Sequence, residues 1–126
     1  MKYLILIFFI LFNLSSANAE WIHLHKDKRF DDWYLDYSSI RRVNDHVFYL
    51  TLVDHDKTQK FQSSISINQG DCNTFEWKTT HIAVYAESMA HKIISKGKTE
   101  DTFKKIENDS ILGYILGTVC TNSESE

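Results

Sequence analysis

A two-residue alternation of apolar and polar side chains runs through much of this chain and points to a β-rich fold. In residues 60–68, for example, Ile65 and Ile67 alternate with Ser64 and Ser66. Successive side chains of a strand point to opposite faces, so this pattern predicts a strand with one buried face. Related patterns place further strands in residues 21–26, 32–37, 46–53, 74–86 and 92–95. Their hairpin spacing predicts about six antiparallel strands in a meander.

The period changes near the end of the chain, where a helix is expected. Residues 108–110 are good helix caps, and the apolar residues that follow recur every three or four positions: Ile111, Leu112, Ile115, Leu116 and Val119. A helix of about ten residues is unstable alone in water, so it must pack on the sheet. The sequence therefore predicts an α+β fold, with about six antiparallel strands, one C-terminal helix packed on them and one disulfide.

Residues 1–19 have the layout of a secretory signal peptide. Lys2 precedes an apolar run over residues 3–12, and Ala17 and Ala19 form an A-x-A site before Glu20. Ten apolar residues span about 15 Å as a helix, roughly half of a bilayer core. We expect cleavage there, a domain over residues 20–126, no transmembrane segment after cleavage, and a periplasmic or secreted location. No cysteine lies at the cut, so lipid attachment there is not available.

Two cysteines, Cys72 and Cys120, lie in the part of the chain predicted to be exported. In an oxidising compartment such a pair tends to form a disulfide. The alternatives are a redox pair or a metal site, but there is no C-x-x-C motif, and two distant cysteines make a poor zinc site. We therefore predict a structural disulfide between Cys72 and Cys120.

Charge and glycine content argue against two classes of function. The net charge is −3, whereas nucleic-acid binders need a clustered cationic surface, so no nucleic acid is expected as a partner. The four glycines do not form a phosphate-binding loop, and no motif calls for a cofactor.

Several segments, taken in order, resemble the surface-adhesin protein E-like domain family. The matching pieces are WYLDYSSIRR at residues 33–42, a β-rich strand ending in Leu50 and Thr51, then Ser63-Ser64, Asp71-Cys72, and a helix closing on Val119-Cys120. The resemblance covers nearly all of the chain from Trp21 to Cys120.

This resemblance implies a small exported protein of a Gram-negative bacterium. It implies a curved sheet of about six antiparallel strands with a C-terminal helix held by a disulfide. For the family's prototype it implies adhesion to host matrix and serum proteins, and dimer formation. The chain departs from the family in two places: it lacks the cysteine of a lipoprotein at the predicted cleavage site, and Phe103 stands where many members carry Trp.

The family motif has a structural interpretation of its own. Asp36, Ser38 and Ser39 have side chains that bond nearby backbone N–H groups in turns, and Ile40 would anchor such a turn in the core. We expect a helical turn to begin here. The alternative is an exposed recognition loop in which Arg41 and Arg42 bind carboxylates.

Aromatic residues are numerous, and one helix covers only one face of a sheet. The other face is expected to carry aromatic and histidine side chains that meet water or a partner. Bracing of cross-strand neighbours would produce the same composition. The candidate contact surface is Trp33, Tyr34, Arg41 and Arg42.

Catalytic and metal sites find little support. His23 and His25 are two apart, which would place both on one face of a strand, with a third ligand from His46, His55 or His81. No H-E-x-x-H motif accompanies them. Ser63 or Ser64 with His81 and an aspartate lacks the G-x-S-x-G context of a hydrolase.

We therefore predict an exported, non-catalytic, adhesin-like protein-binding module. Its partner would be a host extracellular protein, an envelope component or a second copy of the chain in a homodimer. The alternative is a periplasmic metal-binding protein that uses His23 and His25.

Overall fold

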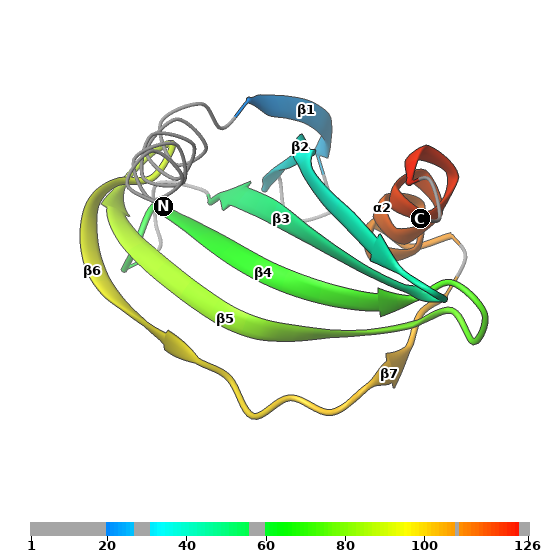
Figure 1. Ribbon diagram of the computed structural model, residues 1–126. Coiled ribbons are helices and arrows are strands. Elements are labelled where there is room, and N and C mark those ends of the chain that lie inside the picture. Colours follow the sequence, from blue (N-terminus) through cyan, green and yellow to red (C-terminus); the bar gives the residue numbers. More distant parts are fainter. Residues whose placement is uncertain (1–19, 27–30, 56–59, 108, 124–126) are drawn as a thin grey trace, which may run out of the picture.

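The computed structural model describes residues 20–26, 31–55, 60–107 and 109–123, which form one curved antiparallel sheet with a helix packed near one end (Figure 1). The strands are β1 (Trp21–Lys26), β2 (Asp32–Val43), β3 (His46–Asp54), β4 (Ser63–Asp71), β5 (Glu76–Glu87), β6 (His91–Lys98) and β7 (Lys104–Lys105). Strands β1 to β6 follow one another across the sheet, and the short β7 pairs with β5. The predicted six-stranded meander is confirmed.

The strand ends differ from the sequence prediction in two places. The run Asn68-Gln69-Gly70-Asp71 by itself predicts a turn, but it continues β4, where Gly70 pairs with Val47 and Asp71 with His46. Gly97 likewise favours a turn, but it pairs with Ile82 inside β6. In both cases pairing with a neighbouring strand outweighs the weak local preference of Asn, Gly and Asp for turns.

The C-terminal helix, α2 (Ile111–Asn122), forms as predicted. Ser110 caps it, because its Oγ accepts a hydrogen bond from the backbone N–H of Gly113 at 3.1 Å. Its buried side chains join those of β2 and β3 in the core: Leu35, Val47, Tyr49, Ile115, Leu116 and Val119. In the described part of the chain, no helix has the length and apolar character needed to cross a membrane.

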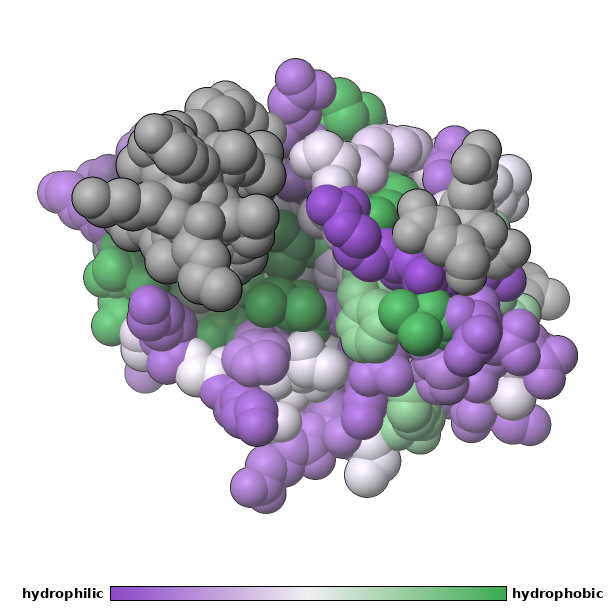
Figure 2. All heavy atoms as spheres, viewed as in Figure 1, coloured by the Kyte–Doolittle hydropathy of each residue, from purple (hydrophilic) through white to green (hydrophobic). Residues whose placement is uncertain are grey.

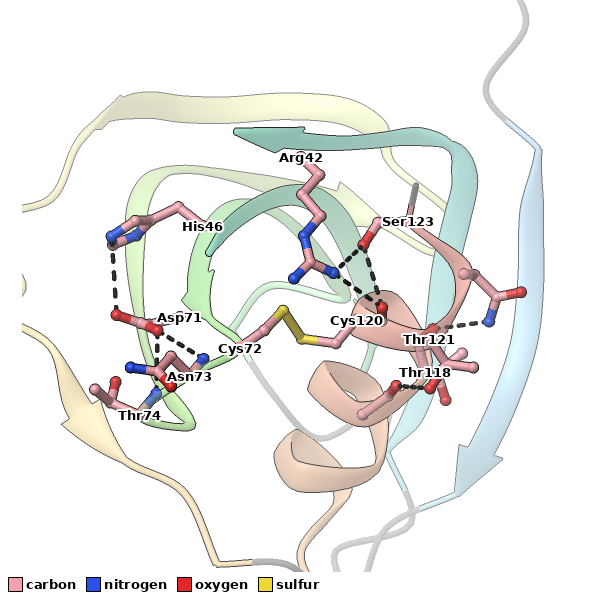
Figure 3. Close-up of a disulfide and its surroundings, with 12 residues drawn as sticks. Arg42, His46, Asp71, Cys72, Asn73, Thr74, Thr118, Cys120, Thr121 and Ser123 are labelled. Atoms are coloured by element: carbon pink, nitrogen blue, oxygen red, sulfur yellow. Dashed lines mark hydrogen bonds and ion pairs between the residues drawn. A yellow bond between two sulfur atoms is a disulfide. The ribbon is translucent and has the colours of Figure 1, made fainter. Parts of the chain in front are cut away.

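Cys72 and Cys120 form the predicted disulfide, with Cα atoms 5.9 Å apart and a sequence separation of 48. The bond joins the turn after β4 to the last turns of α2 (Figure 3). It therefore ties the helix to the end of the sheet on which it packs.

Replacing both cysteines (Cys72→Ala with Cys120→Ala) should lower the free energy of unfolding by about 4 kcal/mol, because the unfolded chain regains the entropy of an open loop. Urea unfolding of the variant and the wild type measures this difference. The wild type with its disulfide reduced should match the variant. Equal stability of oxidised and reduced wild type would contradict the prediction.

Gly70 lies where α2 packs closely against the sheet. A Cβ atom at this position would lie 2.3 Å from Cδ1 of Leu116 and 3.3 Å from Cγ2 of Val47. Both neighbours are fully buried, so neither side chain has open space to move into. The absence of a side chain at Gly70 is thus a condition for the helix to pack here.

Gly70→Ala should therefore destabilise the protein by about 1–3 kcal/mol, the usual cost of overpacking a core. Gly97→Ala is the matched control, because a Cβ there meets no atom within 4 Å, and its effect should stay within about 0.5 kcal/mol. Urea unfolding of the two variants provides the comparison. If both variants lost the same stability, the loss would come from replacing a strand glycine and not from the contact with the helix.

Candidate functional site

The family motif forms an irregular bulge inside β2. Pairing with β3 jumps from Asp36–Leu50 to Arg41–Phe48, so residues 37–40 stand outside the ladder. Asp36 Oδ1 accepts hydrogen bonds from the backbone N–H and the Oγ of Ser38, at 3.0 and 2.5 Å. The expected helical turn does not form, because β2 continues through the motif with its own side chains completing the bulge.

At the bulge, the side chain of Ser39 supplies the hydrogen-bond partners that the neighbouring backbone groups lose. Its Oγ donates to the carbonyl of Asp36 at 2.6 Å and accepts from the N–H of Leu50 at 2.9 Å. A serine hydroxyl can do both at once. The motif thus satisfies backbone groups at the point where β2 and β3 lose register.

Ser39→Ala should cost about 1–3 kcal/mol of stability, since it leaves the N–H of Leu50 without a partner. Ser38→Ala is the control, because it removes a hydroxyl but keeps the backbone N–H bond to Asp36. Thermal unfolding should show the larger loss for Ser39→Ala. A larger loss for Ser38→Ala would overturn this assignment.

Two residues of the predicted contact surface, Trp33 and Tyr34, do not share a face of β2. Trp33 packs against the core, whereas the neighbouring Tyr34 places its ring 5.1 Å from that of His23. Consecutive residues of a strand face opposite sides, so no single surface presents both.

The two arginines differ in role. Arg42 donates from Nε to the carbonyl of Asn44 at 2.9 Å, and from Nη1 to the carbonyl of Cys120 and to Oγ of Ser123, both at 3.3 Å (Figure 3). A cation at the C-terminal end of a helix is favourable, so Arg42 secures α2. Arg41 is exposed, and its Nη1 donates to the carbonyls of Ser38 and Ile40.

The expectation that His23 and His25 share a face assumed that residues of β1 alternate strictly between the two faces. The pairing of β1 with β2 is not regular enough for that assumption. A register shift lies between these two histidines, so His23 pairs with Tyr34 and His25 with Trp33, the adjacent residue of β2. His23 Nε2 lies 2.9 Å from a carboxylate oxygen of Asp32. Among the described residues, no group of three or more His, Cys, Asp or Glu side chains is placed to hold a metal ion.

Asp71 holds the turn that leads into the disulfide (Figure 3). Its Oδ1 accepts from the backbone N–H groups of Asn73 at 2.8 Å and Thr74 at 3.1 Å. The bond from Thr74 is the largest of the causes that lower the pKa of the Asp71 carboxyl, and the nearby His46 also contributes. These bonds favour the charged carboxylate, so Asp71 stabilises the turn above its usual pKa and loses this effect as the pH falls through the lowered value.

The remaining histidines do not form the serine arrangement considered from the sequence. His81 Nδ1 lies 3.0 Å from Oγ1 of Thr80, its neighbour in β5. It is His55 that stands near a serine, with Nε2 3.5 Å from Oγ of Ser64 and Nδ1 3.4 Å from Oδ2 of Asp31. Ser64 is only 6% exposed. These contacts join a loop to the sheet and do not place the hydroxyl in an open cleft.

An apolar groove of about 460 Å³ opens on the sheet beyond the helix. Four strands, β3 to β6, line it with Leu50, Ile65, Ile67, His81, Ile82, Ala83, Lys96, Gly97 and Lys98. Its size falls within the range of about 300–1,000 Å³ typical of ligand pockets. The floor is aliphatic, and two lysines stand on the β6 side.

The side chains left exposed by the fold are mainly aliphatic. Among large apolar residues, the described part exposes Ile22, Tyr37, Val43, Ile67, Ile82, Ile93, Ile94 and Tyr114. Four of these side chains are isoleucines of β4 to β6 and two are tyrosines, so most of the exposed apolar residues are aliphatic and not the aromatic ones that the sequence favoured. Figure 2 shows apolar side chains gathered in a hollow over the sheet, with hydrophilic ones around it. The alternation of Ile65 and Ile67 with serines in β4 was the sequence signal for this surface.

The fold and the disulfide define a small α+β domain in which one helix closes one end of an antiparallel sheet. A family model described as surface-adhesin protein E matches residues 21–121, so the chain belongs to the surface-adhesin protein E family. That family is one of surface adhesins, and membership in it agrees with an adhesin-like binding role and an exported protein.

Solved structures of protein E from Haemophilus influenzae share this fold. One has a TM-score of 0.61 at 16% identity and covers 83% of this chain and 86% of its own. A second crystal form has a TM-score of 0.61 at 15% identity, with coverage of 83% and 90%. The selenomethionine form has a TM-score of 0.60 at 15% identity, with coverage of 79% and 86%. No curated protein matches the chain in sequence.

Proposed function

We propose that this chain is an exported adhesin-like module that binds another protein through the open face of strands β4 to β6. The observation that carries the proposal is the apolar groove on this face, whose lining includes the exposed Ile67 of β4 and Ile82 of β5. Isolated apolar residues are common on protein surfaces, but a contiguous apolar patch with a polar rim is typical of a contact site. Membership in the surface-adhesin family supports the same role.

The partner we propose is a host extracellular protein or a component of the bacterial envelope. Cleavage after Ala19 would release the domain into the periplasm or beyond, where both kinds of partner occur. The disulfide fits an oxidising compartment of this kind. A homodimer, which the family resemblance implies, stays a prediction.

Ile67 lines the groove and is 38% exposed, so Ile67→Asp should weaken partner binding by about tenfold or more. Val43→Asp is the matched control, since Val43 is exposed on β2 and does not line the groove. Binding of the secreted chain to purified extracellular matrix and serum proteins, measured by surface plasmon resonance, gives the comparison.

The same two variants serve in a second assay, in which the chain is cross-linked to its neighbours in the envelope. Capture of a partner by the wild type and by Val43→Asp, but not by Ile67→Asp, is the expected result. A wild type that captures nothing in either assay would refute the proposed function. Equal capture by all three proteins would move the contact site away from the groove.

A further inference from the structure

Strand β6 ends the sheet with an open edge. It pairs with β5 on one side, and no described strand pairs with its other side (Figure 1). All eight of its residues are exposed, including Ile93 and Ile94 at 55% each. An edge of this kind presents a row of backbone N–H and C=O groups that can pair with another chain.

Two lysines give this edge a charge on the groove side. Lys96 pairs with Ala83 and Lys98 with His81 across the β5–β6 ladder, and all four residues line the groove. Neither lysine has an ion-pair partner among the described residues. Lys92, on the same strand, lies 3.5 Å from a carboxylate oxygen of Glu87, so its charge is partly matched already.

We propose that β6 binds an extended, acidic segment of a partner protein by strand addition. The segment would pair its backbone with the open edge of β6 and direct acidic side chains, at every second position, to Lys96 and Lys98 on the groove side. In strand addition the backbone bonds provide affinity and alternate side chains provide specificity. This inference rests on the proposed function and names its partner chemistry.

The lysines also distinguish an acidic partner from a second copy. An antiparallel pair of two β6 strands would bring lysines of one copy toward those of the other, and like charges across a ladder are destabilising. Edge lysines commonly prevent sheets from pairing with themselves. An acidic strand would instead place carboxylates beside these lysines, which is favourable. Charge complementarity therefore favours an acidic partner segment over a second copy of the chain.

The probe for this proposal is a fluorescein-labelled peptide of alternating glutamate and valine, tested by fluorescence anisotropy. The wild type should bind it, and Lys96→Glu with Lys98→Glu should weaken binding by about tenfold or more. Lys60→Glu with Lys105→Glu is the charge-matched control, because both lysines are exposed and lie outside the groove. This control should keep most of the affinity.

Further peptides separate backbone pairing from charge attraction. A peptide with lysine in place of glutamate should not bind, and one methylated on alternate backbone nitrogens should bind far more weakly, because it cannot pair along one edge. Hydrogen exchange of residues 91–98 should slow when the acidic peptide is added. Equal binding of the methylated peptide, or no added protection of β6, would overturn strand addition.

The neutral variant Lys96→Gln with Lys98→Gln guards against an effect of charge reversal on folding, and it should give an intermediate loss. If the acidic peptide binds both double variants as tightly as the wild type, the site is wrong. If the wild type captures an extracellular protein and Lys96→Glu with Lys98→Glu captures it equally well, strand addition fails while the proposed function stands. Self-association of the wild type that the lysine-to-glutamate variant loses would instead assign β6 to a homodimer and overturn the proposal.

Discussion

The contact between α2 and the ends of the central strands holds the molecule together. Leu116 lies over Gly70, where a side chain on the strand would collide with it, and the disulfide from Cys72 to Cys120 fixes the helix at that end of the sheet. Arg42 adds hydrogen bonds to the last turn of the helix. A helix this short depends on such contacts, because it is marginal in water on its own.

One helix covers only one face of a sheet, and this limit leaves the proposed binding surface open. The core formed with α2 lies on β2 and β3, with Gly70 of β4 beneath the helix. The faces of β4, β5 and β6 beyond it keep isoleucines in contact with solvent. A fold of this kind thus separates a part that provides stability from a part that remains free to meet another protein.

Particular residues show how far sequence reasoning reaches. Alternation predicted each of the strands β1 to β6, and the spacing of apolar residues after Ser110 predicted the helix. Both patterns follow from local backbone geometry. The strict alternation assumed for residues 21–26 is interrupted, because a bulge in β1 shifts its pairing with β2 between His23 and His25. Residues 68–71 look like a turn in isolation. They stay in a strand because they continue a ladder of nine consecutive pairs between β4 and β3.

The groove proposed as the binding surface was harder to predict than the strands that carry it. Trp33 and Arg42 are residue types common at interfaces, but the core and the helix end engage them. The groove is lined by residues from four strands, which no linear motif connects.

The sequence by itself determined the elements and the pairing of the two cysteines, because each rests on local pattern or on simple counting. The export signal at residues 1–19 stays a prediction from the sequence. Only the tertiary structure decided which side chains the helix covers, where the strands slip register and which edge stays open. Those features depend on contacts between residues far apart in the chain, and a shift of one residue in strand register reverses the face that every following side chain presents.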